Sequence, residues 1–192
     1  VVGRTLGEFD QYQLPLFLTA TPPVAQNLAR LHNLAPAIAP RQTAAATRAH
    51  LALINARVRQ HNQALSPRVT ALTAQLQRAL EPIVKKGQFV ITHGDYQASN
   101  TVYNLRRKKA GIIDFAETAQ FDPAHDVATF LINARKNYAL IAPRSFIAAV
   151  ERRFLNAYYA TAKPSVARLV RQHLDLFTIR TCLDLIATLS VF

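Results

Sequence analysis

The segment Phe89–Phe115, FVITHGDYQASNTVYNLRRKKAGIIDF, decides how this chain folds. It opens with the apolar run Phe89–Thr92, whose length and bulky side chains are typical of a buried β-strand. A second β-prone stretch, Thr101–Tyr103, is joined by the basic turn Asn104–Lys109 to another apolar run, Gly111–Ile113. Apolar runs on both sides of a short polar turn predict a β-hairpin. The segment therefore predicts strands with polar residues at their ends.

Three oxygen-bearing side chains stand at or just beyond these strand ends: Asp95, Asn100 and Asp114. Magnesium prefers hard oxygen ligands and keeps several waters, so one or two protein side chains suffice to hold it. Asp114 would contribute a negative charge and Asn100 a neutral amide oxygen, which leaves positions for phosphate oxygens. Asp95 is then available to accept a hydroxyl proton during phosphoryl transfer. The set predicts a magnesium and phosphate site, although each residue taken singly is also typical of an ordinary turn.

The polar residues belong to motifs that follow one another in a fixed order: His93-Gly94-Asp95-x4-Asn100, Ile113-Asp114-Phe115 and Asp122-Pro123-x2-Asp126-Val127-Ala128. This ordered set resembles the aminoglycoside phosphotransferase and choline kinase family, whose members have a protein-kinase-like fold and phosphorylate small molecules. The resemblance covers Phe89–Leu131 and is weaker elsewhere. A protein kinase is disfavoured, because Gly94 stands where those enzymes have arginine and no Ala-Pro-Glu motif follows.

The resemblance implies a role for each motif residue. It makes Asp95 the catalytic base and Asn100 and Asp114 the ligands of Mg²⁺, with ATP as the phosphoryl donor and GTP left open. His93 is a second catalytic candidate, with packing beneath the loop as the alternative. Asp126 resembles the buried aspartate that supports the catalytic loop through hydrogen bonds, and Gly94 would let the backbone turn sharply there.

The implied fold class is α+β and mainly α-helical: the C-terminal lobe of a protein-kinase-like fold, with a small β-hairpin carrying the catalytic and metal loops. We expect residues 1–192 to form this single lobe, with residues 1–8 matching the end of the hinge between lobes. The chain shows no glycine-rich phosphate loop, and its first lysines are Lys85 and Lys86. The N-terminal lobe is therefore expected to be absent from this chain.

Outside Phe89–Phe115 the sequence predicts mainly helix. Thr21-Pro22-Pro23 is expected to begin the first helix, because proline is tolerated in a first turn. Leu31-His32 resembles a pair near the end of that helix in the family, and a packed or capping role is favoured for His32. Ser66-Pro67 is expected to cap and open another helix. Further helices are expected over 41–61, 123–137, from 143 onwards and over 166–189.

The net charge of +12 suggests an alternative partner, a nucleic acid or another polyanion. Nucleic acid is disfavoured, because the one basic run, Arg106–Lys109, lies in the predicted hairpin turn, where charges are usually solvated. The single Cys182 excludes an internal disulfide and fits a reducing compartment. The longest apolar stretch, Leu174–Phe192, is interrupted by charged residues and is too polar to span a membrane. We therefore expect a cytoplasmic protein without a membrane partner.

The expected partners are a nucleotide and a small hydroxyl-bearing acceptor. A polycationic aminoglycoside would call for acidic residues around its site. The chain has only eleven Asp and Glu residues, and five of them belong to the motif region. A neutral or anionic metabolite is therefore expected in place of an aminoglycoside. A catalytically incomplete kinase-like binding module is the second interpretation, and a basic polyanion-binding helical domain is the third.

Overall fold

The computed structural model of the chain describes residues 4–5, 13–35 and 39–191. Most of these residues lie in helices: α1 (Leu14–His32), α2 (Ala44–His61), α3 (Ser66–Lys86), α4 (Ala124–Tyr138), α5 (Arg144–Thr161) and α6 (Pro164–Leu189). The strands are short: β1 (Arg4–Thr5), β2 (Val90–Thr92), β3 (Thr101–Asn104), β4 (Lys109–Ile112) and β5 (Ala119–Phe121). The predicted fold class, mainly helical with a small β component, is confirmed.

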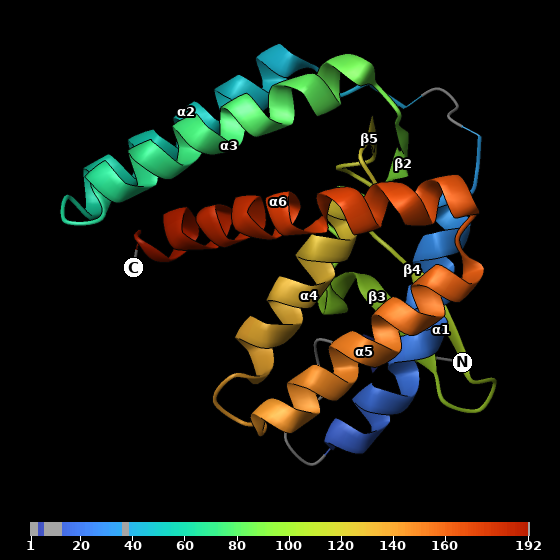
Figure 1. Cartoon of the computed structure of the whole chain (residues 1–192). Helices are drawn as coiled ribbons and strands as arrows, with labels where there is room; N and C mark the ends of the chain where they lie inside the picture. The colour runs from blue at the N-terminus through green and yellow to red at the C-terminus, as the bar shows by residue number, and fades with distance from the viewer. Residues whose placement is uncertain (1–3, 6–12, 36–38, 192) are drawn as a thin grey trace.

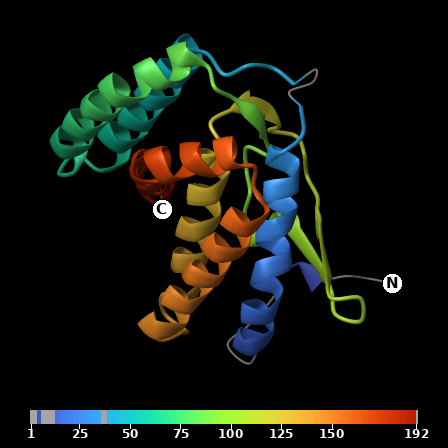
Figure 2. The same cartoon turned by 45° about the vertical axis from the view of Figure 1, so that its right-hand side comes forward.

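Helix α6 lies between two groups of helices (Figure 1). The long α2–α3 hairpin packs on one side of it, and α4 and α5 lie on the other, with α1 against α5. The view in Figure 2 shows the same separation of the α2–α3 hairpin from the remaining helices. Strands β2 and β5 lie next to the start of α4, and β3 and β4 lie further along, with β4 beside α1 (Figure 1).

Each helix group encloses its own hydrophobic core. The first core lies among α1, α4 and α5, where the rings of Phe130 and Phe154 stack with centroids 4.3 Å apart. The second lies among α2, α3 and α6 and contains Leu51, Leu80 and Phe177. Burying one such side chain contributes about 1.5–3 kcal/mol relative to leaving it in water. Because α4 and α6 contribute to both cores, they join the two groups.

Helix α1 begins earlier than the sequence predicts. Pro22 and Pro23 lie inside the helix, and the proline in its first turn is Pro15. Pro22 has no backbone N–H, so the Leu18 carbonyl loses its usual intrahelical donor. A guanidinium nitrogen of Arg153, on α5, donates to that carbonyl at 3.4 Å. The long-range bond and the burial of Val24 and its neighbours offset the interruption, which local sequence rules do not anticipate.

The cap of α3 also differs from the prediction. Ser66 is the first helical residue and the cap is Leu65, whose N–H donates to the side-chain oxygen of Asn62 at 3.2 Å. Gly87 ends the helix in the left-handed conformation, at φ 64°, which glycine adopts without strain. Among the described residues, no helix has both the length and the apolar character needed to cross a membrane.

Two small sheets replace the single hairpin expected from the sequence. β3 and β4 form the predicted antiparallel hairpin, with Thr101 opposite Ile112. β2 instead pairs with β5, a strand that was not predicted, with Val90 opposite Phe121. The loop 93–100 therefore runs from the β2–β5 pair directly into β3 of the hairpin. Of the proposed hinge, Arg4–Thr5 pairs with β3; its residues 1–3 and 6–8 lie outside the described residues.

Candidate active site

The loop after β2 is bound to the first turn of α4 through one carboxylate. Asp126, which is fully buried, accepts hydrogen bonds from the backbone N–H groups of His93 at 2.6 Å and Gly94 at 3.0 Å. Nε2 of His32 also donates to it, at 3.0 Å. Burial alone would raise the pKa of Asp126, but the hydrogen bond and charge of His32 and the hydrogen bond from the His93 N–H lower it. Asp126 is therefore held ionised beneath the loop.

Gly94 sits where no side chain fits. Its φ is 91°, and a Cβ built there would lie 2.2 Å from the backbone oxygen of Glu117. Only glycine adopts such a φ without strain. The close approach brings the segment before β5 directly over the loop. The sharp turn expected at Gly94 from the sequence is present, and its physical reason is this backbone crossing.

Asp95 and Asn100 lie side by side. The amide nitrogen of Asn100 donates both to Oδ2 of Asp95, at 2.9 Å, and to the Asp95 backbone oxygen, at 2.9 Å. Gln97 donates to the same Oδ2 at 2.9 Å. Asn100 is buried and Asp95 is half-buried. These bonds fix the orientation of the Asp95 carboxylate and leave the amide oxygen of Asn100 free for a ligand.

Asp114 follows β4 and is exposed, at φ 62°, a conformation that aspartate tolerates better than most residues. The preceding residue, Ile113, ties this position to the loop: its N–H donates to the Asn100 backbone oxygen at 3.0 Å. Its carbonyl accepts from Nε2 of His93 at 2.9 Å. His93 is fully buried and its ring lies 5.1 Å from that of Phe115. The structure thus places His93 beneath the loop, where it links the Asp95 and Asp114 segments.

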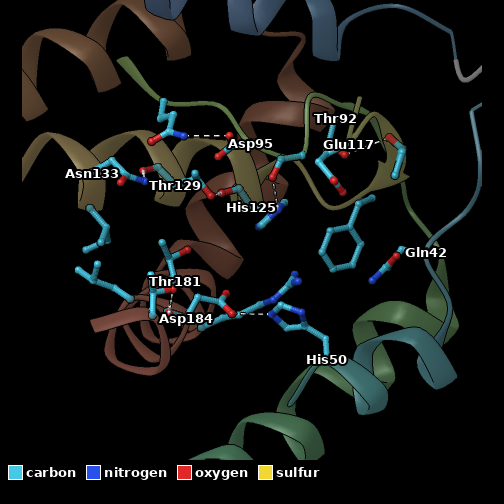
Figure 3. A pocket seen from close by; sticks show the side chains of 18 of the residues that line it. Gln42, His50, Thr92, Asp95, Glu117, His125, Thr129, Asn133, Thr181 and Asp184 are labelled. Carbon is cyan, nitrogen blue, oxygen red and sulfur yellow. Dashed lines mark hydrogen bonds and ion pairs between the residues drawn. The ribbon is translucent and has the colours of Figure 1, made fainter. Parts of the chain in front are cut away.

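A cavity of about 440 Å³ opens beside Asp95 (Figure 3). Asp95 lies at one side of it and the His50–Asp184 pair at the other. Nε2 of His50 donates to Asp184 at 2.6 Å. The wall between them includes His125, whose Nε2 bonds to the Gly94 backbone oxygen at 3.0 Å. Burial, then the charge of Arg180, lowers the pKa of His125 to about 4, so His125 is neutral at pH 7 and donates to that oxygen.

Sequence reasoning missed several of these residues. His50, Asp184 and Arg180 come from α2 and α6, far from the motif in sequence, and no local pattern marks them. It also missed the bond between Nδ1 of His173 and the buried Asp122, at 2.6 Å. His32 is packed, as favoured, and the Tyr158 hydroxyl lies 2.6 Å from its Nδ1. Within the described residues, no three His, Cys, Asp or Glu side chains cluster to hold a metal unaided.

Comparison with known proteins places this site in a family. A family model described as the phosphotransferase enzyme family matches residues 20–167, more than half of the chain. The chain belongs to that phosphotransferase family, and the resemblance inferred from the motifs is confirmed. No curated protein sequence matches the chain.

Solved structures of small-molecule kinases share the fold. Glucosamine kinase is similar at 17% identity and a TM-score of 0.67, over 93% of this chain and 53% of that one. The aminoglycoside phosphotransferase APH(3'')-Id of Streptomyces rimosus, solved with ADP and streptomycin, is similar at 20% identity and a TM-score of 0.62. The match covers 92% of this chain and 67% of that one. Ethanolamine kinase of Plasmodium vivax is similar at 14% identity and a TM-score of 0.59, over 95% of this chain and 55% of that one. The chain thus spans about half to two thirds of the proteins it matches.

Proposed function

We propose that this protein is a kinase that transfers the γ-phosphoryl group of Mg-ATP to a hydroxyl of a small metabolite. The observation that carries the proposal is the Asp95 carboxylate, oriented by Asn100 and Gln97 and facing a cavity of metabolite size. Pockets of about 300–1,000 Å³ are typical of small-molecule sites. Family membership supports the reaction class; the donor and the acceptor are inferred from the residues.

Asp95 acts in this proposal as the general base. The acceptor hydroxyl approaches its carboxylate and gives up its proton as the oxygen attacks the γ-phosphorus, the bond between that phosphorus and the β-phosphate oxygen breaks, and ADP leaves. The hydrogen bonds from Asn100 and Gln97 hold the carboxylate before the acceptor arrives, which reduces the entropy cost of reaching the reactive geometry. Asp126 holds the loop, so it positions Asp95 without touching the reacting atoms.

The residues present fit a magnesium ion. Asn100 uses its amide nitrogen to bind Asp95, so its oxygen is available, and Asp114 offers an exposed carboxylate on the segment tied to Asn100. Two hard oxygen donors suffice, because Mg²⁺ completes its shell with waters and phosphate oxygens. When bound, the ion would neutralise charge on the phosphates. We therefore assign Asn100 and Asp114 as its ligands.

The acceptor is proposed to be other than an aminoglycoside. Of the three acidic residues beyond Asp126, Glu151 pairs with Arg135 and Asp184 with His50, and Asp175 lies outside the cavity lining. The cavity is also lined by two cationic side chains, Lys136 and Arg180. A polycation would meet these charges unfavourably. Efficient ATP-dependent phosphorylation of kanamycin would refute this part of the proposal.

The assignment of the base is tested with Asp95→Asn in the full natural chain. The variant should lose at least about 100-fold in turnover, because general-base catalysis contributes 10²–10⁴-fold, and should bind nucleotide like the wild type. Asp175→Asn, on an exposed position of α6 outside the cavity, is the matched control. Full activity in Asp95→Asn would exclude Asp95 as the base. Acceptor binding by the wild type without any phosphoryl transfer would favour the kinase-like binding module instead.

A further inference from the structure

Arg180 is a buried cation in the wall of the cavity beside Asp95. It lies on α6 and is only 6% exposed. Two of its guanidinium nitrogens, Nε and Nη1, are buried without a hydrogen-bond partner. Its guanidinium carbon lies 5.2 Å from the centroid of the Phe121 ring, and the charge of Asp184 also acts favourably on it. A cation facing a ring in this way gains far less than a hydrogen-bonded ion pair.

The charge of Asp184 favours the charged guanidinium of Arg180, but no ion pair joins the two side chains. Asp184 lies one helical turn further along α6, but its carboxylate accepts from His50 at 2.6 Å. None of the ion pairs formed by the described residues includes Arg180. His125, also in the wall, is neutral at pH 7 because its pKa is about 4. Arginine cannot relieve its burial by losing a proton at this pH.

A buried charge without a partner is costly, and proteins retain one where a ligand supplies the opposite charge. The guanidinium is suited to this, because its planar donors match the oxygens of a carboxylate or a phosphate. Arg180 lines the same cavity as Asp95, so an anion bound in that cavity would be the partner that its guanidinium lacks.

We propose that Arg180 binds an anionic group of the acceptor, a carboxylate or a phosphomonoester, while the acceptor hydroxyl meets Asp95. The inference rests on the proposed kinase function for the identity of the ligand as acceptor. It narrows the acceptor from a neutral or anionic metabolite to a hydroxyl-bearing anion. Arg180 is a specificity residue in this assignment and takes no part in proton transfer.

The anion site is tested first without nucleotide or turnover, using inorganic sulfate as the probe. Sulfate should raise the Tm of the full natural chain with the logarithm of its concentration once that exceeds the Kd, and Arg180→Gln should lose most of that rise. Arg171→Gln is the matched control, because Arg171 is exposed on the same helix and stacks on Tyr159. A sulfate response that is equal in all three proteins would overturn the proposal. Circular dichroism checks that the variant is folded, and Arg180→Met provides a second variant if the first is not.

The acceptor is tested with ATP and three matched compounds: glucose, gluconate and glucose 6-phosphate. The anionic compounds should be phosphorylated with a lower KM than glucose, and Arg180→Gln should raise the KM of the anionic compounds by about 10-fold or more, well beyond its effect on the KM of glucose. The two anions separate carboxylate from phosphate recognition. Preference for glucose, or an unchanged KM of the anionic compounds in the variant, would overturn the anion-site inference while leaving the proposed kinase function supported. Arg180-dependent sulfate binding without phosphorylation of any compound would instead count against the kinase and uphold the anion site.

Discussion

Asp126→Asn should weaken both the fold and the catalytic loop. The aspartate accepts three hydrogen bonds at full burial: from the N–H groups of His93 and Gly94 and from His32. An asparagine has one acceptor oxygen, and its NH₂ group would face a backbone N–H. Removing one partner of a buried charged network costs about 3–5 kcal/mol. Because domains are stable by only about 5–15 kcal/mol, the variant should fold but lose a large part of its stability.

The assay is urea unfolding followed by circular dichroism, with Asp175→Asn as a surface control that should change stability by less than about 0.5 kcal/mol. Turnover of the folded variant should fall about 100-fold, because a displaced loop moves Asp95 away from its reactive position. A loss of stability below about 1 kcal/mol would refute the reasoning. So would full activity in a variant that is strongly destabilised.

The same carboxylate predicts a pH dependence. Burial opposes ionisation of Asp126, but its hydrogen bond to His32 and the nearby charges lower its pKa in the folded state. A carboxyl whose pKa is lower when folded stabilises the fold at pH values above its unfolded pKa, about 3.9. That contribution is lost as the pH falls through the folded value. The stability difference between wild type and Asp126→Asn should therefore shrink on acidification below about pH 4, and a constant difference would contradict this account.

Two further substitutions test the surroundings of the loop. Gly94→Ala should destabilise the protein by about 2 kcal/mol or more and reduce turnover, because the φ of 91° is strained for alanine and the added Cβ would meet the Glu117 backbone. Thermal unfolding and a kinase assay measure the two effects. A substitution without effect would contradict the close approach of the Glu117 backbone to Gly94. Tyr158→Phe should cost about 1 kcal/mol by removing the hydroxyl beside His32, with Tyr159→Phe as the control, and an equal loss in both variants would contradict that role.

Local patterns predicted the parts of the fold that depend on neighbours in sequence. The hairpin formed by β3 and β4 and the helix after Pro123 were expected from apolar runs and turn residues, and both are present. β5 was missed because Ala119–Phe121 has only three residues and is ordered by pairing with β2. The start of α1 was misplaced because the effect of Pro22 is offset by Arg153, which is more than a hundred residues away.

In the candidate site too, local sequence patterns predicted some residues, and others are placed by long-range packing. The motif spacing marks Asp95, Asn100 and Asp114, and the structure brings Asp95 and Asn100 into direct contact. The proposed acceptor side was not foreseen, because Arg180 reaches the cavity through the packing of α6 on α2 and α3. Such a residue has no local signature: within the sequence it is one arginine among many, and its burial alone distinguishes it.

The two separate cores have an evolutionary consequence. The loop that carries Asp95 is anchored by Asp126 to α4 and through His32 to α1, whereas the far wall of the cavity is formed by α2 and α6. Under the proposed function, substitutions in that wall would change which acceptors are recognised without disturbing the residues that orient Asp95. A lineage with this architecture would be able to diversify its substrates while conserving its chemistry, because the far wall lies on α2 and α6, away from the helices that anchor the loop.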